Sequence, residues 1–320
     1  MGDFFVRLAA LIAMLPFIYG ACALVQFTVI RPRMRPVVIG FFATVAATIG
    51  LLGLLSFTAP AILNPRTGTL LLVLAIVTAL PLWRPVRALL ARVTPLDPDS
   101  AVDLSGLIAL LWLLTLTGTT LTTVNLQEAA TQVRITPADA IVNLLAYPLL
   151  AFSLVGIFLT RGWRESVKRL GLERLSPRQI LLAVALVVPL LVLNFAFDVA
   201  ARRLQPEVYA DLQGVLRAMS SNVTNPLVAV LLGLSAGVGE EILFRGAIQP
   251  RLGIVLTTLA FSVGHLQYGF TYAVAFIIVV GIILGYERKY LNTTACIITH
   301  ATFNTIGFLL PLLAGAGGGG

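Results

Sequence analysis

Long apolar runs alternate with short polar segments along the whole chain. Crossing about 30 Å of hydrocarbon takes roughly 20 apolar residues at 1.5 Å per residue. Nine runs that lack Asp, Glu, Lys and Arg approach or exceed that length, and they are 8–30, 36–65, 67–83, 104–127, 140–160, 179–197, 218–239, 252–286 and 290–320. This pattern is typical of a protein with many transmembrane helices.

The eighth run is too long for one crossing. As a single helix, residues 252–286 would extend roughly 52 Å. We divide the run near Gln267–Tyr272, where Gly269 and polar side chains permit a turn. The chain is therefore predicted to be an all-α, polytopic integral membrane bundle of about ten transmembrane helices.

The composition excludes a soluble fold of this size. Apolar residue types make up 58% of the 320 residues and charged types only 11%, and the mean hydropathy is +0.96. Soluble domains carry about 25% charged residues. The only cysteines, Cys22 and Cys296, lie inside apolar runs, which excludes a disulfide scaffold. The first run has no basic segment before it and no small-residue cleavage site, so it is interpreted as a retained span.

The basic residues lie between the apolar runs. The net charge is +8, but no basic stripe is interleaved with aromatic residues, so nucleic-acid binding is not expected. If the N-terminus lies outside, 16 of the 22 Lys and Arg residues fall in inner loops. Positive charge favours the inner side of a membrane. We therefore expect a multi-pass protein of the cell membrane with both termini outside.

Two polar segments have helical periodicity. The inner basic loop 161–178 places Trp163, Val167 and Leu170 at helical spacing, which favours a short helix at the membrane surface. The segment 201–219 has one apolar face, formed by Leu204, Val208, Leu212, Leu216 and Met219. This second segment is either a helix resting on lipid headgroups or a lid over a site.

Ionisable side chains concentrate in the last third of the apolar chain. Each costs about 2.5–3.5 kcal/mol inside a membrane, so such residues usually mark function. Glu240, Glu241 and Arg245 end the seventh run, His265 lies in the eighth, and His300 and Asn304 lie in the last. Both histidines of the chain belong to this set. Glu240, His265 and His300 are expected to lie at similar depth.

Residue spacing assigns these side chains to helix faces. Glu241 and Arg245 are four residues apart, in the favourable order for an ion pair within a helix. Glu240 points about 100° away, so the two carboxylates need not share a role. His300 and Asn304 share one face, as do Phe261 and His265.

Hydrolysis is the chemistry that this set supports. A carboxylate in a low dielectric can accept a proton from water, and a neutral histidine can hold that water. A histidine with an asparagine amide can supply donors to a developing oxyanion. Neither serine nor cysteine has a comparable base partner, since Ser262 and His265 are badly placed for attack on one helix.

Three spaced motifs resemble those of a known family. GEEILFRGAIQPRLG, FSVGH and HATFN are similar to the EExxxR, FxxxH and HxxxN motifs of the CAAX-protease and bacteriocin-processing family of intramembrane endopeptidases. The resemblance covers residues 176–320, which we expect to form the protease core. Residues 1–175 resemble the variable N-terminal membrane extensions of bacterial members.

The resemblance implies a role for each motif residue. Glu240 would be the general base on a water that His265 helps to position. His300 and Asn304 would stabilise the tetrahedral oxyanion. The pair of Glu241 and Arg245 would support the site, and Phe261 would wall the pocket. The implied activity is cleavage of a membrane-embedded or lipid-anchored peptide or protein. The sequence indicates no oligomeric state.

The residues leave the role of a metal and two further functions open. A metalloprotease with zinc held by Glu240, His265 and His300 is an alternative to the metal-free, glutamate-dependent scheme, which needs no cofactor and which we favour. A non-catalytic immunity or scaffold protein that keeps the motifs to bind a partner is the first rival function. A proton-coupled transporter with a relay through Glu240 and His265 is the second.

Overall fold

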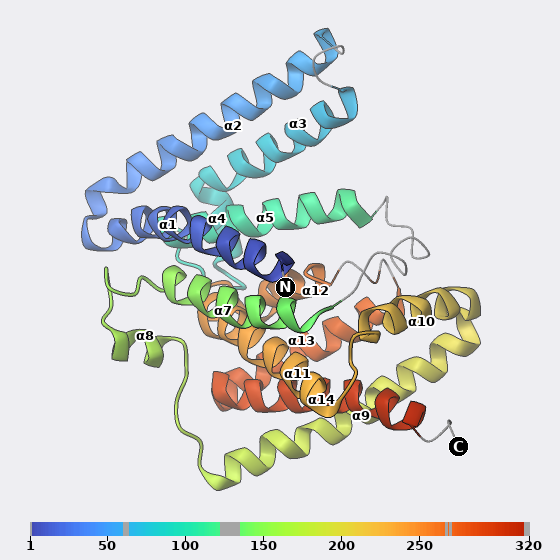
Figure 1. Ribbon diagram of the computed structural model, residues 1–320. Coiled ribbons are helices and arrows are strands. Elements are labelled where there is room, and N and C mark those ends of the chain that lie inside the picture. Colours follow the sequence, from blue (N-terminus) through green and yellow to red (C-terminus); the bar gives the residue numbers. More distant parts are fainter. Residues whose placement is uncertain (1, 60–63, 122–134, 266–267, 269–270, 317–320) are drawn as a thin grey trace.

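The described part of the chain is mostly helical. The computed structural model describes residues 2–59, 64–121, 135–265, 268 and 271–316 (Figure 1). Within these residues no β-strand is present, and the only bridge joins Ile157 to Arg161. The predicted all-α class is confirmed.

The first part of the chain forms long helices joined by short turns. Its elements are α1 (Gly2–Ile30), η1 (Pro32–Met34), α2 (Arg35–Thr58), α3 (Pro65–Ala79), η2 (Leu80–Leu82), α4 (Arg84–Leu90) and α5 (Ala101–Leu121). In Figure 1, α2 and α3 lie side by side at one edge of the molecule, and α5 lies between them and the remaining helices.

The second part contains the motif-bearing helices. Its elements are α7 (Pro137–Leu154), α8 (Trp163–Arg169), α9 (Pro177–Leu204), α10 (Pro206–Ser220), α11 (Pro226–Glu241), η3 (Ile242–Ile248), α12 (Gln249–Val263), α13 (Tyr272–Tyr290) and α14 (Thr293–Ala316). Helix α11 packs against both α7 and α14. Helices α9 and α14 lie at the edge opposite to α2 and α3 (Figure 1).

Local sequence fixes several helix starts. Ser176 accepts a hydrogen bond from the backbone N–H of Gln179 at the start of α9, and Asn225 accepts one from Val228 at the start of α11. Proline follows each of these caps, at a position where no backbone N–H is needed. The polar residues between the apolar runs therefore specify where the long helices begin.

Among the described residues, eight helical stretches are long and apolar enough to cross a membrane, by length and composition. They include α1, α2, α3, α5, α7, α9, α14 and one continuous stretch, Pro226–Val263, which joins α11, η3 and α12. The ten crossings predicted from the sequence are reached when α12 is counted apart from α11 and α13 is added to the eight stretches. Helix α13 is not among the eight stretches, and it carries Glu287, Arg288 and Lys289 in its last turn.

A sharp bend at Gly253 reverses the stretch Pro226–Val263. Gly253 has φ 78° and ψ 174°, a backbone conformation that residues with a Cβ atom rarely adopt. A Cβ atom there would also lie 2.9 Å from Cδ of Pro95. Beyond the bend, α12 returns as far as Val263 and α13 begins at Tyr272, so the predicted division of the eighth run is confirmed.

The two polar segments form short helices at opposite ends of the bundle (Figure 1). Helix α8 begins at Trp163, whose ring stacks on Phe152 with centroids 5.0 Å apart. Helix α10 starts at Pro206, so Leu204 does not belong to its apolar face as expected and instead ends α9, where it is exposed. Proline cannot donate the N–H that would continue α9.

Candidate active site

The EExxxR motif lies where the helix type changes. Glu240 and Glu241 are the last residues of α11, and Arg245 lies in the π-helical segment η3. π-Helical turns are rare and occur frequently at functional sites. The two adjacent carboxylates therefore lie directly before the π-helical segment.

Glu241 and Arg245 form a fully buried ion pair. The distance between Arg245 Nη1 and Glu241 Oε1 is 2.9 Å, and the side chains are 1% and 0% exposed. The Arg245 guanidinium carbon also lies 4.2 Å from the centroid of the Phe261 ring. Breaking such a pair strands a buried charge, at a cost of about 3–5 kcal/mol.

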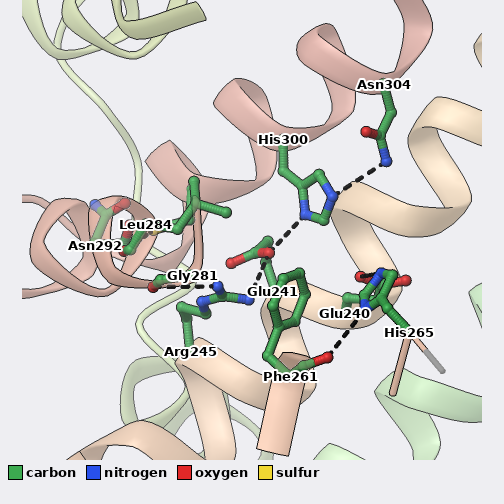
Figure 2. A network of polar contacts seen from close by, with 11 residues as sticks. Glu240, Glu241, Arg245, Phe261, His265, Gly281, Leu284, Asn292, His300 and Asn304 are labelled. Atoms are coloured by element: carbon green, nitrogen blue, oxygen red, sulfur yellow. Dashed lines mark hydrogen bonds and ion pairs between the residues drawn. The ribbon is translucent and has the colours of Figure 1, made fainter. Parts of the chain in front are cut away.

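The same carboxylate holds the histidine of the third motif (Figure 2). Glu241 Oε1 accepts a hydrogen bond from Nδ1 of His300 at 2.6 Å. The remaining ring nitrogen, Nε2, lies 3.1 Å from Nδ2 of Asn304. A neutral His300 protonated on Nδ1 satisfies both contacts, since Asn304 then donates to Nε2.

Glu240 faces the other histidine. Its Oε2 atom lies 3.9 Å from Nε2 of His265, beyond direct hydrogen-bonding distance. This oxygen is buried and has no hydrogen-bond partner among the described residues. Nδ1 of His265 lies 2.9 Å from the carbonyl oxygen of Phe261, which requires the proton to be on Nδ1. In a neutral imidazole, Nε2 of His265 is therefore the acceptor, and it faces the Glu240 carboxylate.

Phe261 lies at the centre of the cluster. Its ring centroid is 4.8 Å from that of His265 and 6.0 Å from that of His300. The side chain is 2% exposed and lies between the Arg245 guanidinium and His265 (Figure 2).

One cavity of about 460 Å³ is lined by both the Glu240–His265 pair and the His300–Asn304 pair. Glu240, His265, His300 and Asn304 all line it, whereas Glu241 and Arg245 do not. Its volume lies within the roughly 300–1,000 Å³ of typical small-ligand sites. The other walls are largely apolar and aromatic, with contributions from Phe197, Leu212, Leu216, Tyr268, Tyr272, Phe276 and Phe303.

Several lining residues were missed by the sequence interpretation. Asn143 and Tyr147 of α7 line the cavity, although α7 lies in the predicted N-terminal extension. Neither residue has a motif or a charge that would have marked it. Gln213 of α10 lines the cavity as well, so this helix covers part of the site.

A further buried carboxylate lies behind the ion pair. Glu287 was not singled out by the sequence interpretation, but its side chain is 7% exposed and accepts a hydrogen bond from Oγ1 of Thr299 at 2.7 Å. Its last-turn position next to Arg288 and Lys289 concealed this burial in the sequence.

The donor set does not converge on a metal position. Among the described residues, no group of three His, Cys, Asp or Glu side chains is arranged to hold a metal ion. Both ring nitrogens of His300 already have protein partners, Glu241 and Asn304. The proposed zinc set of Glu240, His265 and His300 therefore does not fit this geometry without rearrangement.

A comparison with protein families identifies the segment that carries the site. Residues 222–306 match the model of the family described as "Type II CAAX prenyl endopeptidase Rce1-like". The match includes all three motifs and confirms the resemblance seen in the sequence. No curated protein and no solved structure matches the chain. With eight apolar helical stretches among its described residues, the chain is a multi-pass membrane protein, and residues 222–306 are similar to an endopeptidase family.

Proposed function

We propose that the chain is an intramembrane endopeptidase that hydrolyses a peptide bond of a membrane-embedded or lipid-anchored peptide or protein. One observation carries the proposal: the buried, unpartnered Oε2 atom of Glu240 faces His265 across 3.9 Å, inside a cavity that His300 and Asn304 also line. Unpartnered buried polar atoms are rare, and those that occur require an explanation such as catalysis.

Two acceptors can hold one attacking water. Because His265 carries its proton on Nδ1, neither its Nε2 atom nor an ionised Glu240 can donate to the other. A water molecule can donate one hydrogen to each, which leaves an oxygen lone pair for a substrate carbonyl. Glu240 then takes the proton as the general base, and His265 keeps the water in place.

The opposite half of the cavity suits an oxyanion. Asn304 can donate one amide hydrogen to His300 and a second to the developing negative charge. His300, held by Glu241 at 2.6 Å, keeps the Asn304 amide in this orientation through its Nε2 atom. Preorganised donors of this kind contribute several kcal/mol to transition-state binding.

The nature of the cavity favours an apolar substrate. Aromatic and aliphatic side chains form most of its walls, and α10 covers part of it. The matched family is described as a CAAX prenyl endopeptidase family. A lipid-anchored peptide is therefore the substrate class to test first. We also propose the orientation predicted from the sequence, with both termini outside.

The decisive experiment compares protein termini in membranes of cells that express wild type, Glu240→Gln or Glu173→Gln at matched levels. Glu173 is an exposed loop carboxylate outside the cavity, so it controls for the chemical change. We expect new termini near membrane segments with wild type and Glu173→Gln, and none with Glu240→Gln. Purified wild type should cleave the identified substrate at least about 10²-fold faster than Glu240→Gln.

The rival functions give different results in the same experiment. An immunity or scaffold protein would produce identical termini in all three strains, and Glu240→Gln would rescue its phenotype. A proton-coupled transporter would also leave the termini unchanged, but Glu240→Gln would abolish proton-driven uptake into vesicles. Either result would contradict the endopeptidase proposal.

A further inference from the structure

A second polar cluster lies at the α8 end of the bundle, apart from the candidate active site. Arg161 follows α7, Arg169 ends α8, Arg251 lies in the first turn of α12, and Arg288 lies in the last turn of α13. All four side chains are half-buried and line one open cavity of about 850 Å³. Four separate chain segments therefore bring guanidinium groups together.

The acidic neighbours of this cluster are already engaged. Asp103 pairs with Arg251 at 2.5 Å and accepts a hydrogen bond from the backbone N–H of Asp97. Glu165 caps α8 through the backbone N–H of Gly162, and the Asp97 carboxylate accepts from the N–H of Asp99. These three acids and the exposed Lys168 complete the charged lining.

Three of the four arginines make no ion pair within the described part of the chain. Arg161 donates to the carbonyl oxygen of Val155 at 2.5 Å, Arg169 to that of Gly246 at 3.0 Å, and Arg288 to that of Arg245 at 3.2 Å. A guanidinium has five N–H donors, so most remain available to a ligand.

The electrostatics of the cluster are those of an anion site. Burial, followed by the positive charges of Arg251, Arg161 and Arg288, lowers the pKa of Arg169 to about 10. The folded chain therefore holds these cations together against their mutual repulsion. A bound anion would relieve that repulsion and form charge-assisted hydrogen bonds.

An apolar cavity continues from the arginines into the bundle. It measures about 520 Å³ and shares Asp103, Arg161, Arg169 and Arg251 with the polar cavity. Its walls are small and aliphatic residues of α1, α5, α7, η3 and α12, among them Val25, Gly106, Ala109, Leu150 and Ala247. A ligand that fills both cavities has a negative head and an apolar tail.

We propose that this composite site binds one anionic phospholipid, with its phosphate among Arg161, Arg169 and Arg251 and an acyl chain between α1, α5 and η3. Basic pockets between transmembrane helices are a common way to bind lipid headgroups. The lipid would fasten the N-terminal helices to the motif-bearing segment. This assignment does not depend on the proposed peptidase activity, and it goes beyond that function.

Binding should be measured on the full chain, purified in mild detergent and reconstituted into phosphatidylcholine nanodiscs with or without phosphatidylglycerol. Native mass spectrometry reports retained lipid, and thermal unfolding reports stabilisation. We expect wild type to retain phosphatidylglycerol in preference to phosphatidylcholine. Arg169→Gln should weaken retention about tenfold, as the loss of a charge-assisted contact implies.

A second variant tests the apolar half, and two matched controls test specificity. Gly106→Leu adds a side chain where a Cβ atom meets nothing within 4 Å, so it should fill the cavity and displace the acyl chain without a clash at the backbone. Gly20→Leu in α1 adds the same bulk on an exposed face, and Arg164→Gln in α8 removes the same charge outside the cavity. Both controls should retain the lipid.

Three results would overturn the proposal. Equal retention of both lipids would remove the role of the arginines, and equal losses in Arg164→Gln and Arg169→Gln would indicate a general surface charge effect. Competition by inorganic phosphate, with full retention by Gly106→Leu, would assign the cluster to a free anion. If Arg169→Gln does not fold, Arg169→Lys and Gly106→Leu still provide the test of each half.

Discussion

The Oε1 atom of Glu241 lies 2.6 Å from Nδ1 of His300 and 2.9 Å from Nη1 of Arg245. One carboxylate oxygen thus joins the end of α11 to α14 and to η3, while the adjacent Glu240 is directed into the cavity. In the proposed mechanism the two neighbouring glutamates therefore have different roles: Glu241 organises the site, and Glu240 acts as the base.

Substitution of Glu241 should affect stability more than substitution of Glu240. Glu241→Gln leaves the buried Arg245 without its counter-charge and should lower the free energy of unfolding by about 3–5 kcal/mol. Glu240→Gln, at a cavity-facing atom with no partner, should unfold like wild type. Denaturant unfolding in detergent measures both, and equal stability of the two variants would contradict this division.

Close approach of α11 and α14 should depend on Gly237. A Cβ atom at this position would lie 2.6 Å from both Cβ and N of Ala301. Gly237→Ala should therefore separate the helices that carry Glu240 and His300, lowering both thermal stability and peptidase activity. Gly307→Ala in α14 is the matched control, because a Cβ atom at this position meets nothing within 4 Å. This substitution should raise the free energy of unfolding by about 0.5–1 kcal/mol.

The Phe261 ring should support both halves of the site. Phe261→Leu keeps an apolar side chain but removes the face that lies 4.2 Å from the Arg245 guanidinium. We expect a loss of about 0.5–2 kcal/mol in stability from the cation–π contact alone. Loss of the contact with the His265 ring should also lower kcat. Phe57→Leu, on an exposed face of α2, should change neither the melting temperature nor turnover.

Peptide cleavage should persist without a metal ion. The proposed water is held by Glu240 and His265 alone, and both nitrogens of His300 have protein partners. Turnover of a lipidated peptide by the purified chain should be unchanged after dialysis against 1,10-phenanthroline and EDTA. Loss of activity that returns with added Zn²⁺ would show that the site rearranges around a metal.

Sequence spacing predicted contacts within one helix, but for residues on different helices it predicted only that Glu240, His265 and His300 lie at similar depth. The Glu241–Arg245 pair follows from a separation of four residues, which one helical turn brings together. The hydrogen bond that His300 donates to Glu241 joins residues 59 positions apart. No periodicity encodes that separation, so only the packing of α11 on α14 reveals it.

The change of helix type and the bend were also beyond sequence interpretation. Nothing in ILFRGAI distinguishes a π-helical segment from an α-helix, because both bury the same apolar residues. From the sequence alone, Gly253 looks like a glycine that is tolerated inside a helix. Its close contact with Pro95 is visible only in the structure. The lining residues Asn143 and Tyr147 were hidden for a similar reason, since they carry no charge that makes them costly in an apolar run.

The bend at Gly253 has a consequence for the order in which the site forms during synthesis. Glu240 and His265 lie on either side of one hairpin and can meet as soon as that hairpin has entered the membrane. His300 and Asn304 are made later, on α14. A growing chain would thus hold its water-activating pair before it could stabilise a reaction intermediate. The protein would remain inactive towards neighbouring nascent chains until α14 docks.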